Sequence, residues 1–114
     1  MRSSSIMCAD ETVNEVSSLD GERRAQVSVR NCGATTDYAT VVALVSRRWL
    51  LPDSSEAVFV GAAMGAGPRG PGGGPEVRVQ WRGPRDLIIF HHSAVGVFRA
   101  DSKASDVTVT YEKF

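Results

Sequence analysis

The sequence predicts a small all-β domain, mostly antiparallel, in which about seven strands form a meander folded as a sandwich or a half-open barrel. Three observations support this fold class. Apolar and polar residues alternate with a period of two along most of the chain. Turn-forming dipeptides separate the alternating runs, and no long segment carries a convincing helical stripe. We therefore expect little helix.

The clearest strand signals come from two runs in the first half of the chain. In "RRAQVSVRN", Ala25, Val27 and Val29 share one face and polar residues occupy the other, which is typical of a half-buried strand. "DYATVVALVSRRW" is rich in β-branched residues and apolar on both faces from Thr40 to Val45, as expected of a central strand. Further strands are expected in "EAVFVGAA", "PEVRVQW", "DLIIFHH", "VGVFRA" and "DVTVTYE".

Turn chemistry separates these runs. Asp20-Gly21 suits the positive backbone angles of a tight hairpin turn, and "GPRD" turns the chain between two later strands. In "PEVRVQW", Val77, Val79 and Trp81 are expected to face inward, with arginine and glutamine on the outer side.

Length, charge and hydropathy limit the class of protein. The chain has 114 residues and is expected to form one β domain, 1–114, with residues 1–10 disordered or loosely attached. Its net charge is zero, so no overall field attracts nucleic acid or an anionic membrane. No apolar run is long enough for a transmembrane segment, and "MRSSSIMCADE" lacks the apolar region of a signal peptide.

The stretch 64–75 is rich in glycine and proline. Gly65 to Gly70 match the G-x-G-x-x-G pattern of dinucleotide sites, but that pattern requires a following helix. Here "PGGGPEVRV" leads into a strand, because proline and glycine oppose a helix. We expect a rigid, solvent-facing loop between strands, with Arg69 at its tip and no nucleotide or other cofactor.

Few residues suggest chemistry. Cys8 and Cys32 are the only cysteines, too few for a metal site, and their position leaves a disulfide and two buried thiols equally open. Adjacent strand residues point to opposite faces, so His91 and His92 cannot chelate one metal, and one of them is expected to face the core. The arginines near Trp49 and Trp81 are most simply a solvated face.

The element "NCGATT" offers the best candidate binding rim. Asn31 tolerates the left-handed backbone that ends a strand, and the hydroxyls of Thr35 and Thr36 can hydrogen-bond nearby backbone. These groups either satisfy the turn or face the glycine stretch across a rim that binds a partner. The candidate rim comprises Asn31, Thr35, Thr36, Arg69, His91 and His92.

"SSLDGERRAQVSVRNCGATT" followed by "GPGGGPEVRVQW" and "LIIFHHSAVGVFRA" resembles a group of small uncharacterised bacterial proteins. Members are commonly exported or anchored behind a hydrophobic N-terminus, and Cys8 and Cys32 match two cysteines of their pattern. The resemblance therefore implies a Cys8–Cys32 disulfide and a periplasmic or cell-envelope location. Leu19 replaces a proline of the pattern, and "DYATVVALV" replaces a more polar strand.

The expected function is a non-catalytic binding or accessory module of the bacterial cell envelope, acting on a protein or a small polar ligand rather than on nucleic acid. Two alternatives remain. One is a small hydrolase using Cys32 or a histidine. The other is a cytosolic inhibitor or immunity-type protein with reduced cysteines.

We predict that protein from an oxidising compartment has no free thiols. Mass spectrometry of unreduced protein, alkylated under denaturing conditions, should detect no labelled cysteine. Because the bond would close a loop of about 25 residues, its reduction should cost about 3–4 kcal/mol of stability. Two labelled cysteines would contradict the disulfide.

Overall fold

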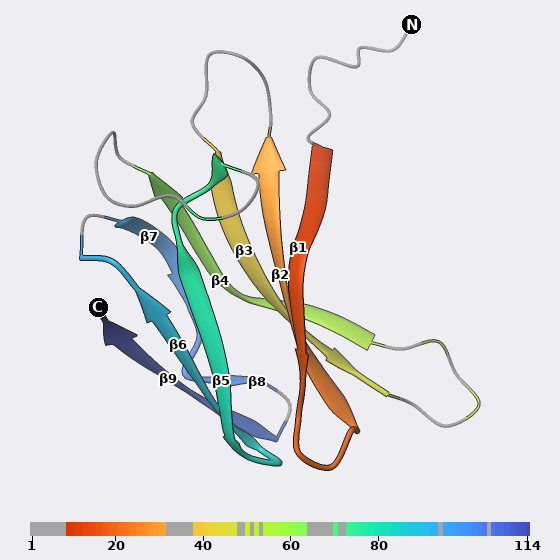
Figure 1. Ribbon diagram of the computed structural model, residues 1–114. Coiled ribbons are helices and arrows are strands. Elements are labelled where there is room, and N and C mark those ends of the chain that lie inside the picture. Colours follow the sequence, from red (N-terminus) through yellow and green to blue (C-terminus); the bar gives the residue numbers. More distant parts are fainter. Residues whose placement is uncertain are drawn as a thin grey trace, which may run out of the picture.

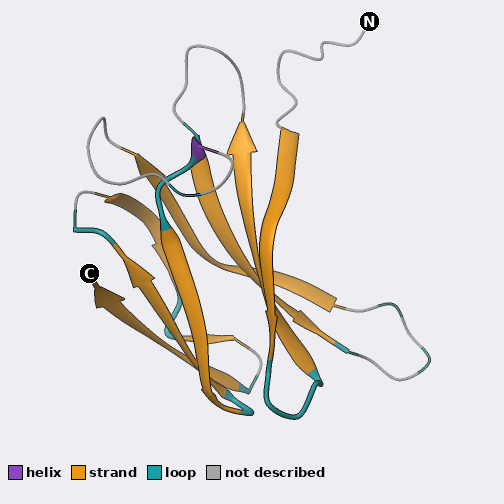
Figure 2. Cartoon of the chain, viewed as in Figure 1, coloured by secondary structure: helices purple, strands orange, loops and turns teal. Residues whose placement is uncertain are grey.

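The computed structural model describes residues 9–31, 38–47, 50, 52, 54–63, 70, 73–93, 95–104 and 106–114. Within these ranges the chain is all β and contains no α-helix (Figure 2). Its strands are β1 (Ala9–Ser17), β2 (Arg23–Asn31), β3 (Ala39–Ser46), β4 (Ser54–Ala63), β5 (Val77–Gly83), β6 (Asp86–His91), β7 (Val95–Ala100), β8 (Lys103–Ala104) and β9 (Val107–Lys113).

The strands form two sheets that face each other (Figure 1). The larger sheet has the order β1-β2-β3-β4-β7 and the smaller one the order β5-β6-β9-β8. Every neighbouring pair is antiparallel except β6 and β9, which are parallel. The predicted fold class is confirmed, in its sandwich form.

The strand order departs from a simple meander in the second half of the chain. After β6 the chain crosses to the larger sheet, adds β7 at its edge, and then returns to the smaller sheet. β6 and β9 are parallel. Parallel strands cannot be joined by a tight turn, and this crossover provides the longer connection that they need.

Two strands, β1 and β8, are not among those that the sequence pattern indicates. β1 is an edge strand with exposed residues at most positions. Its register shifts between Thr12 and Asn14, so Val13 is an extra residue in the strand. Val13 and Val16, three apart, both pack against the core, and this spacing hides the alternation. β1 begins at Ala9, within the stretch 1–10 expected to be loosely attached, and residues 1–8 lie outside the described ranges.

The core lies between the sheets and is built from the inward row of each strand. Trp81 is only 7% exposed, as predicted, and Val77 and Val79 pack beside it at the edge of the core. β3 occupies the middle of the larger sheet and is buried on both faces, also as predicted. The core cluster consists of Ala25, Val27, Val42, Leu44, Val58, Phe59, Trp81, Leu87, Ile89, Val95, Ala104, Val107 and Val109.

A β-bulge in β4 lets two consecutive residues enter the core. Val58 and Phe59 are both fully buried, although strict alternation would turn one of them outward. The register between β3 and β4 shifts at Val42/Ala43, which leaves Val58 as the extra residue. The bulge thus places the largest fully buried side chain, Phe59, next to a second buried residue.

The predicted turn at Asp20-Gly21 is confirmed. Gly21 has φ 75°, a conformation that glycine adopts without strain. The Asp20 carboxylate accepts hydrogen bonds from the Ser18 hydroxyl at 2.7 Å and from the Glu22 N–H at 3.0 Å. The hydrogen bond from the Glu22 N–H is the main cause that lowers the pKa of Asp20, and the hydrogen bond from the Ser18 hydroxyl is the second. The second predicted turn, 83–86, joins β5 to β6.

Polar contacts join the two sheets at their borders. The Trp81 Nε1–H donates to the Val16 carbonyl at 2.9 Å, so the edge strand β5 is tied to the edge strand β1. Asp106, just before β9, accepts from Arg23 of β2 at 2.7 and 2.8 Å and lies 3.1 Å from Arg85. In the described part of the chain, no helix is long and apolar enough to cross a membrane.

We predict that Trp81→Ala lowers the free energy of unfolding by about 3–5 kcal/mol, because it empties an aromatic core site. Trp81→Phe should cost less, about 1–2 kcal/mol, since most of the ring volume stays and the loss is mainly the hydrogen bond to Val16. Urea denaturation measures both. A loss below about 1 kcal/mol for the alanine variant would mean that the indole is not a core residue.

Candidate functional site

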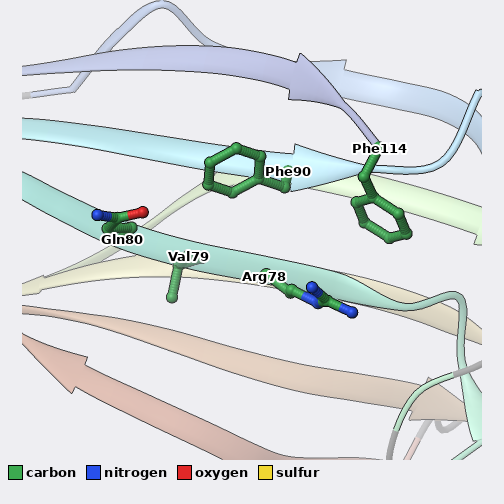
Figure 3. A pocket seen from close by; sticks show the side chains of 5 residues that line it. All are labelled: Arg78, Val79, Gln80, Phe90 and Phe114. Atoms are coloured by element: carbon green, nitrogen blue, oxygen red, sulfur yellow. The ribbon is translucent and has the colours of Figure 1, made fainter.

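An open hollow of about 470 Å³ is lined by Arg78, Val79, Gln80, Phe90 and Phe114 (Figure 3). Arg78 and Gln80 alternate with the inward row of β5, so they lie on the outer face of the smaller sheet. Arg78 is paired with Phe90 of β6, and paired residues share a face. Val79 points away from both rings in Figure 3 and packs against the core. The hollow therefore lies on the outer face.

The last residue of the chain forms one wall of this hollow. The Phe114 N–H donates to the His91 carbonyl at 3.1 Å, which continues the pairing of β9 with β6 by one more residue. Phe114 is 42% exposed. The ring of His92 meets it edge-on at a centroid distance of 6.1 Å. Phe114 is thus held at the sheet surface with its ring accessible.

Arg78 is positioned by two neighbours. Its Nε and Nη2 donate to a Glu76 carboxylate oxygen at 3.0 and 2.9 Å, and its guanidinium carbon lies 5.2 Å from the centre of the Phe114 ring. A cation over an aromatic face is attracted by the ring quadrupole. The Arg78 side chain nevertheless stays 66% exposed. Its remaining N–H groups are therefore available to a ligand.

These groups suit a small ligand with one apolar face. The volume falls within the range of known ligand pockets, which combine apolar walls with a few directed polar groups. Phe90 and Phe114 supply the apolar walls. Gln80 offers both a hydrogen-bond donor and an acceptor, and Arg78 offers donors. The arrangement favours binding through stacking and hydrogen bonds.

The sequence predicts only part of this site. Arg78 and Gln80 are correctly placed outward, but Phe90 lies in a run that is apolar on both faces, so its direction cannot be inferred from alternation. Phe114 lies beyond the last predicted strand. Its contact with Arg78 depends on β9 being parallel to β6.

The predicted rim is described only in part. Asn31 ends β2 and lines a smaller hollow of about 160 Å³ with Tyr38 and residues of β1. There Asp10 hydrogen-bonds Arg30, and this bond raises the pKa of the arginine. Thr35, Thr36 and Arg69, like Cys8 and Cys32, lie outside the described residues. His91 is the last residue of β6 and His92 follows it, so both lie at the end of a strand of the smaller sheet, whereas Asn31 ends a strand of the larger one.

The described residues at the end of the glycine stretch pack against β3. The prediction of a solvent-facing loop is therefore wrong for these residues. Gly74 and Pro75 are buried. A Cβ on Gly74 would lie 2.6 Å from the Thr40 hydroxyl, which donates to the Pro75 carbonyl at 2.7 Å. Gly73, with φ 91°, lies against the ring of Tyr38. Close packing here requires residues without a side chain, and Tyr38 connects this stretch to the hollow at Asn31.

The two histidines face opposite sides, as predicted. His91 is 8% exposed and stacks on Phe59 at a centroid distance of 5.5 Å. Its Nδ1 lies 3.1 Å from the His92 carbonyl, an acceptor, so Nδ1 carries the proton in this contact. His92 is half-buried beside Phe114. The described residues contain no group of three or more His, Cys, Asp or Glu that could hold a metal ion.

Tyr111 completes the aromatic cluster around His91. Its hydroxyl lies 3.0 Å from the Val58 carbonyl and 2.7 Å from the Asp101 carbonyl, so one proton serves two acceptors. This contact joins β9 to β4 and to the connection between β7 and β8. The pKa of Tyr111 is raised to about 12, mainly by burial and secondly by the charge of Asp101.

We predict that stability falls as the pH rises from about 10 to about 12, because the unfolded chain, with a tyrosine pKa near 10, loses this proton first. The Tyr111 pKa of about 12 sets the upper limit. Since the ring is half-exposed, screening reduces the loss to about 1 kcal/mol. Urea unfolding across this window should give a flatter pH dependence for Tyr111→Phe than for Tyr38→Phe, the control. Equal slopes would contradict the assignment.

Comparison with known proteins returned no matching family, no similar curated protein and no similar solved structure. The resemblance carried by "NCGATT" and "GPGGGPEV" therefore remains an expectation, and the functional conclusion depends on the geometry of the hollow.

Proposed function

We propose that this chain is a non-catalytic binding module of the bacterial cell envelope, and that the hollow on the smaller sheet is its ligand site. The observation that carries the proposal is an open, aromatic-walled hollow of about 470 Å³ with two exposed polar side chains directed into its rim. The envelope location follows from the resemblance of the sequence to exported proteins, as does the proposed Cys8–Cys32 disulfide.

The ligand chemistry that fits best is a saccharide ring. One face of a sugar ring presents C–H groups, which pack on an aromatic surface such as Phe114 or Phe90. Its hydroxyl or acetamido groups can exchange hydrogen bonds with Gln80, and an oxygen can accept from Arg78. The cation held over the Phe114 ring keeps this wall in place before a ligand arrives, which reduces the ordering cost of binding.

A hydrolase using His91 is less well supported. His91 is in the core, stacked on Phe59, and its Nδ1 is engaged by the His92 carbonyl. A general base must reach the proton that it removes, and a buried ring between aromatic side chains does not reach a ligand in the hollow. The binding test below decides between the saccharide proposal and the inhibitor alternative.

We predict that N-acetylglucosamine oligomers, used as the probe, shift the backbone amide signals of Arg78, Gln80 and Phe90 in ¹H–¹⁵N spectra. Phe114→Ala should weaken this binding about tenfold, because it removes one stacking wall. Phe98→Ala is the matched control: Phe98 is 71% exposed on β7 of the other sheet, so its loss should leave the affinity unchanged.

Shifts confined to the larger sheet would contradict the site. A Phe114→Ala variant that binds as tightly as the parent, with an unchanged melting temperature, would contradict the stacking role. If no saccharide shifts these signals while a protein partner does, the inhibitor alternative replaces the proposal.

A further inference from the structure

The strand β7 lies at one edge of the larger sheet, at the opposite side from β1 (Figure 1). It pairs with β4 on one side, and among the described strands none pairs with it on the other. Two of its side chains are apolar and exposed: Val97 is 42% exposed and Phe98 is 71% exposed. An uncovered edge strand presents unpaired N–H and C=O groups to a further strand. The larger sheet can therefore be extended at β7.

The other described edges are less open to pairing. β1 contains the acids Asp10, Glu11 and Glu15 and no basic residue, so a second copy of it would meet like charges. β5 is tied to β1 through Trp81, and β8 has only two residues. β7 has one charged residue, Arg99, and no proline. Of the described edges, β7 is the least protected.

The backbone of Ala100 is directed toward the free side of β7. The Asp101 N–H donates to the Val58 carbonyl of β4 at 2.8 Å. In an antiparallel pair, residues that exchange hydrogen bonds with the neighbouring strand alternate with residues that do not. Because Asp101 bonds to β4, the N–H and C=O of Ala100 point away from β4. Ala100 is exposed, so a further strand can bond to it.

Arg99 and Asp101 flank Ala100 and carry opposite charges. Their side chains share one face, where the Arg99 Nη2 lies 3.0 Å from the Asp101 carboxylate, and 51% and 31% of the two side chains stay exposed. An antiparallel copy of this segment centred on Ala100 places each arginine opposite an aspartate. A copy centred on Arg99 places the two arginines opposite each other. Charge complementarity therefore selects the register centred on Ala100.

We propose that β7 pairs antiparallel with β7 of a second copy of this chain, about a two-fold axis at Ala100. The pairing joins two five-stranded sheets into one continuous sheet. At the axis the two Ala100 residues exchange N–H···O=C bonds, and on each side Arg99 faces Asp101 of the second copy. Phe98, two residues from the axis, lies within diagonal reach of the second copy, so part of this exposed ring becomes covered.

A β-bulge at Phe98 limits the length of this pairing. The register between β4 and β7 shifts between Val60 and Gly61, which leaves Phe98 as the extra residue. A bulge bends and twists an edge strand and so interrupts regular pairing. After Asp101 the chain leaves for the smaller sheet. The contact is therefore short, and because small interfaces bind weakly we expect a dimer Kd on the order of 100 µM.

Sedimentation equilibrium of the full chain measures this association, in a reducing agent that prevents cysteine cross-links. Arg99→Asp and Asp101→Arg each place like charges across the axis, so each should raise the dimer Kd at least about tenfold. An equimolar mixture of the two variants restores both opposite-charge pairs, so a heterodimer should form with a Kd within about threefold of the parent's. In the parent, hydrogen exchange of the Ala100 amide should slow as the protein concentration rises.

Arg82→Asp is the matched control, because Arg82 also forms an exposed ion pair, with Glu112, but on the smaller sheet. It changes the net charge by the same amount as Arg99→Asp and should leave the dimer Kd unchanged. Mixing Arg82→Asp with Asp101→Arg gives the same opposite net charges and should not restore the parent's affinity. That comparison separates strand pairing from general electrostatic attraction.

The proposal fails if the parent stays monomeric at about 1 mM, or if Arg82→Asp weakens association as much as Arg99→Asp. It also fails if the two charge-reversed variants do not associate when mixed. An Ala100 amide whose exchange does not depend on concentration in the parent overturns it whatever the variants do. None of these outcomes depends on saccharide binding, since the hollow lies on the other sheet.

Discussion

The structure depends on closing two twisted sheets over one core, and Trp81 makes that closure at the border between β1 and β5. Its ring fills space between the sheets, while its N–H donates to the Val16 carbonyl on the neighbouring edge strand. One side chain thus contributes apolar burial and also satisfies a backbone acceptor at an edge, where unpaired carbonyl groups would otherwise remain. On another border, Tyr111 bonds the Val58 carbonyl, so aromatic residues with a polar end join the sheets on two sides.

This closure leaves distinct surfaces for other roles. Among the described elements, none covers the outer face of the smaller sheet, so Phe90, Arg78 and Gln80 can form a hollow there without disturbing the core. β3 and β4 run past the smaller sheet (Figure 1), and Leu50 in the connection between them is exposed.

Two of the register shifts between described strands, the bulges in β1 and β4, explain where sequence patterns fail in this chain. A bulge adds a residue to one strand and shifts the alternation beyond it. In β1 the shift brings Val13 and Val16 to the same side, so a mostly polar segment that looks like a loop is an edge strand. In β4 it buries Val58 and Phe59 together. The candidate site is affected for a related reason, because Phe90 lies in a strand with apolar residues on both faces and its direction depends on pairing with Arg78.

The sequence by itself determined the all-β class, the inward row that ends at Trp81, the central position of β3, the Asp20-Gly21 turn and the opposite orientations of His91 and His92. All of these depend on local rules: a period of two along a strand and the backbone freedom of glycine. The tertiary structure alone decided the partition into two sheets, the parallel pairing of β6 with β9, the packing of Gly74 against Thr40, and the contact of Arg78 with Phe114. Those features join residues far apart in the chain. Alternation specifies which face a side chain occupies but not which strand lies beside it.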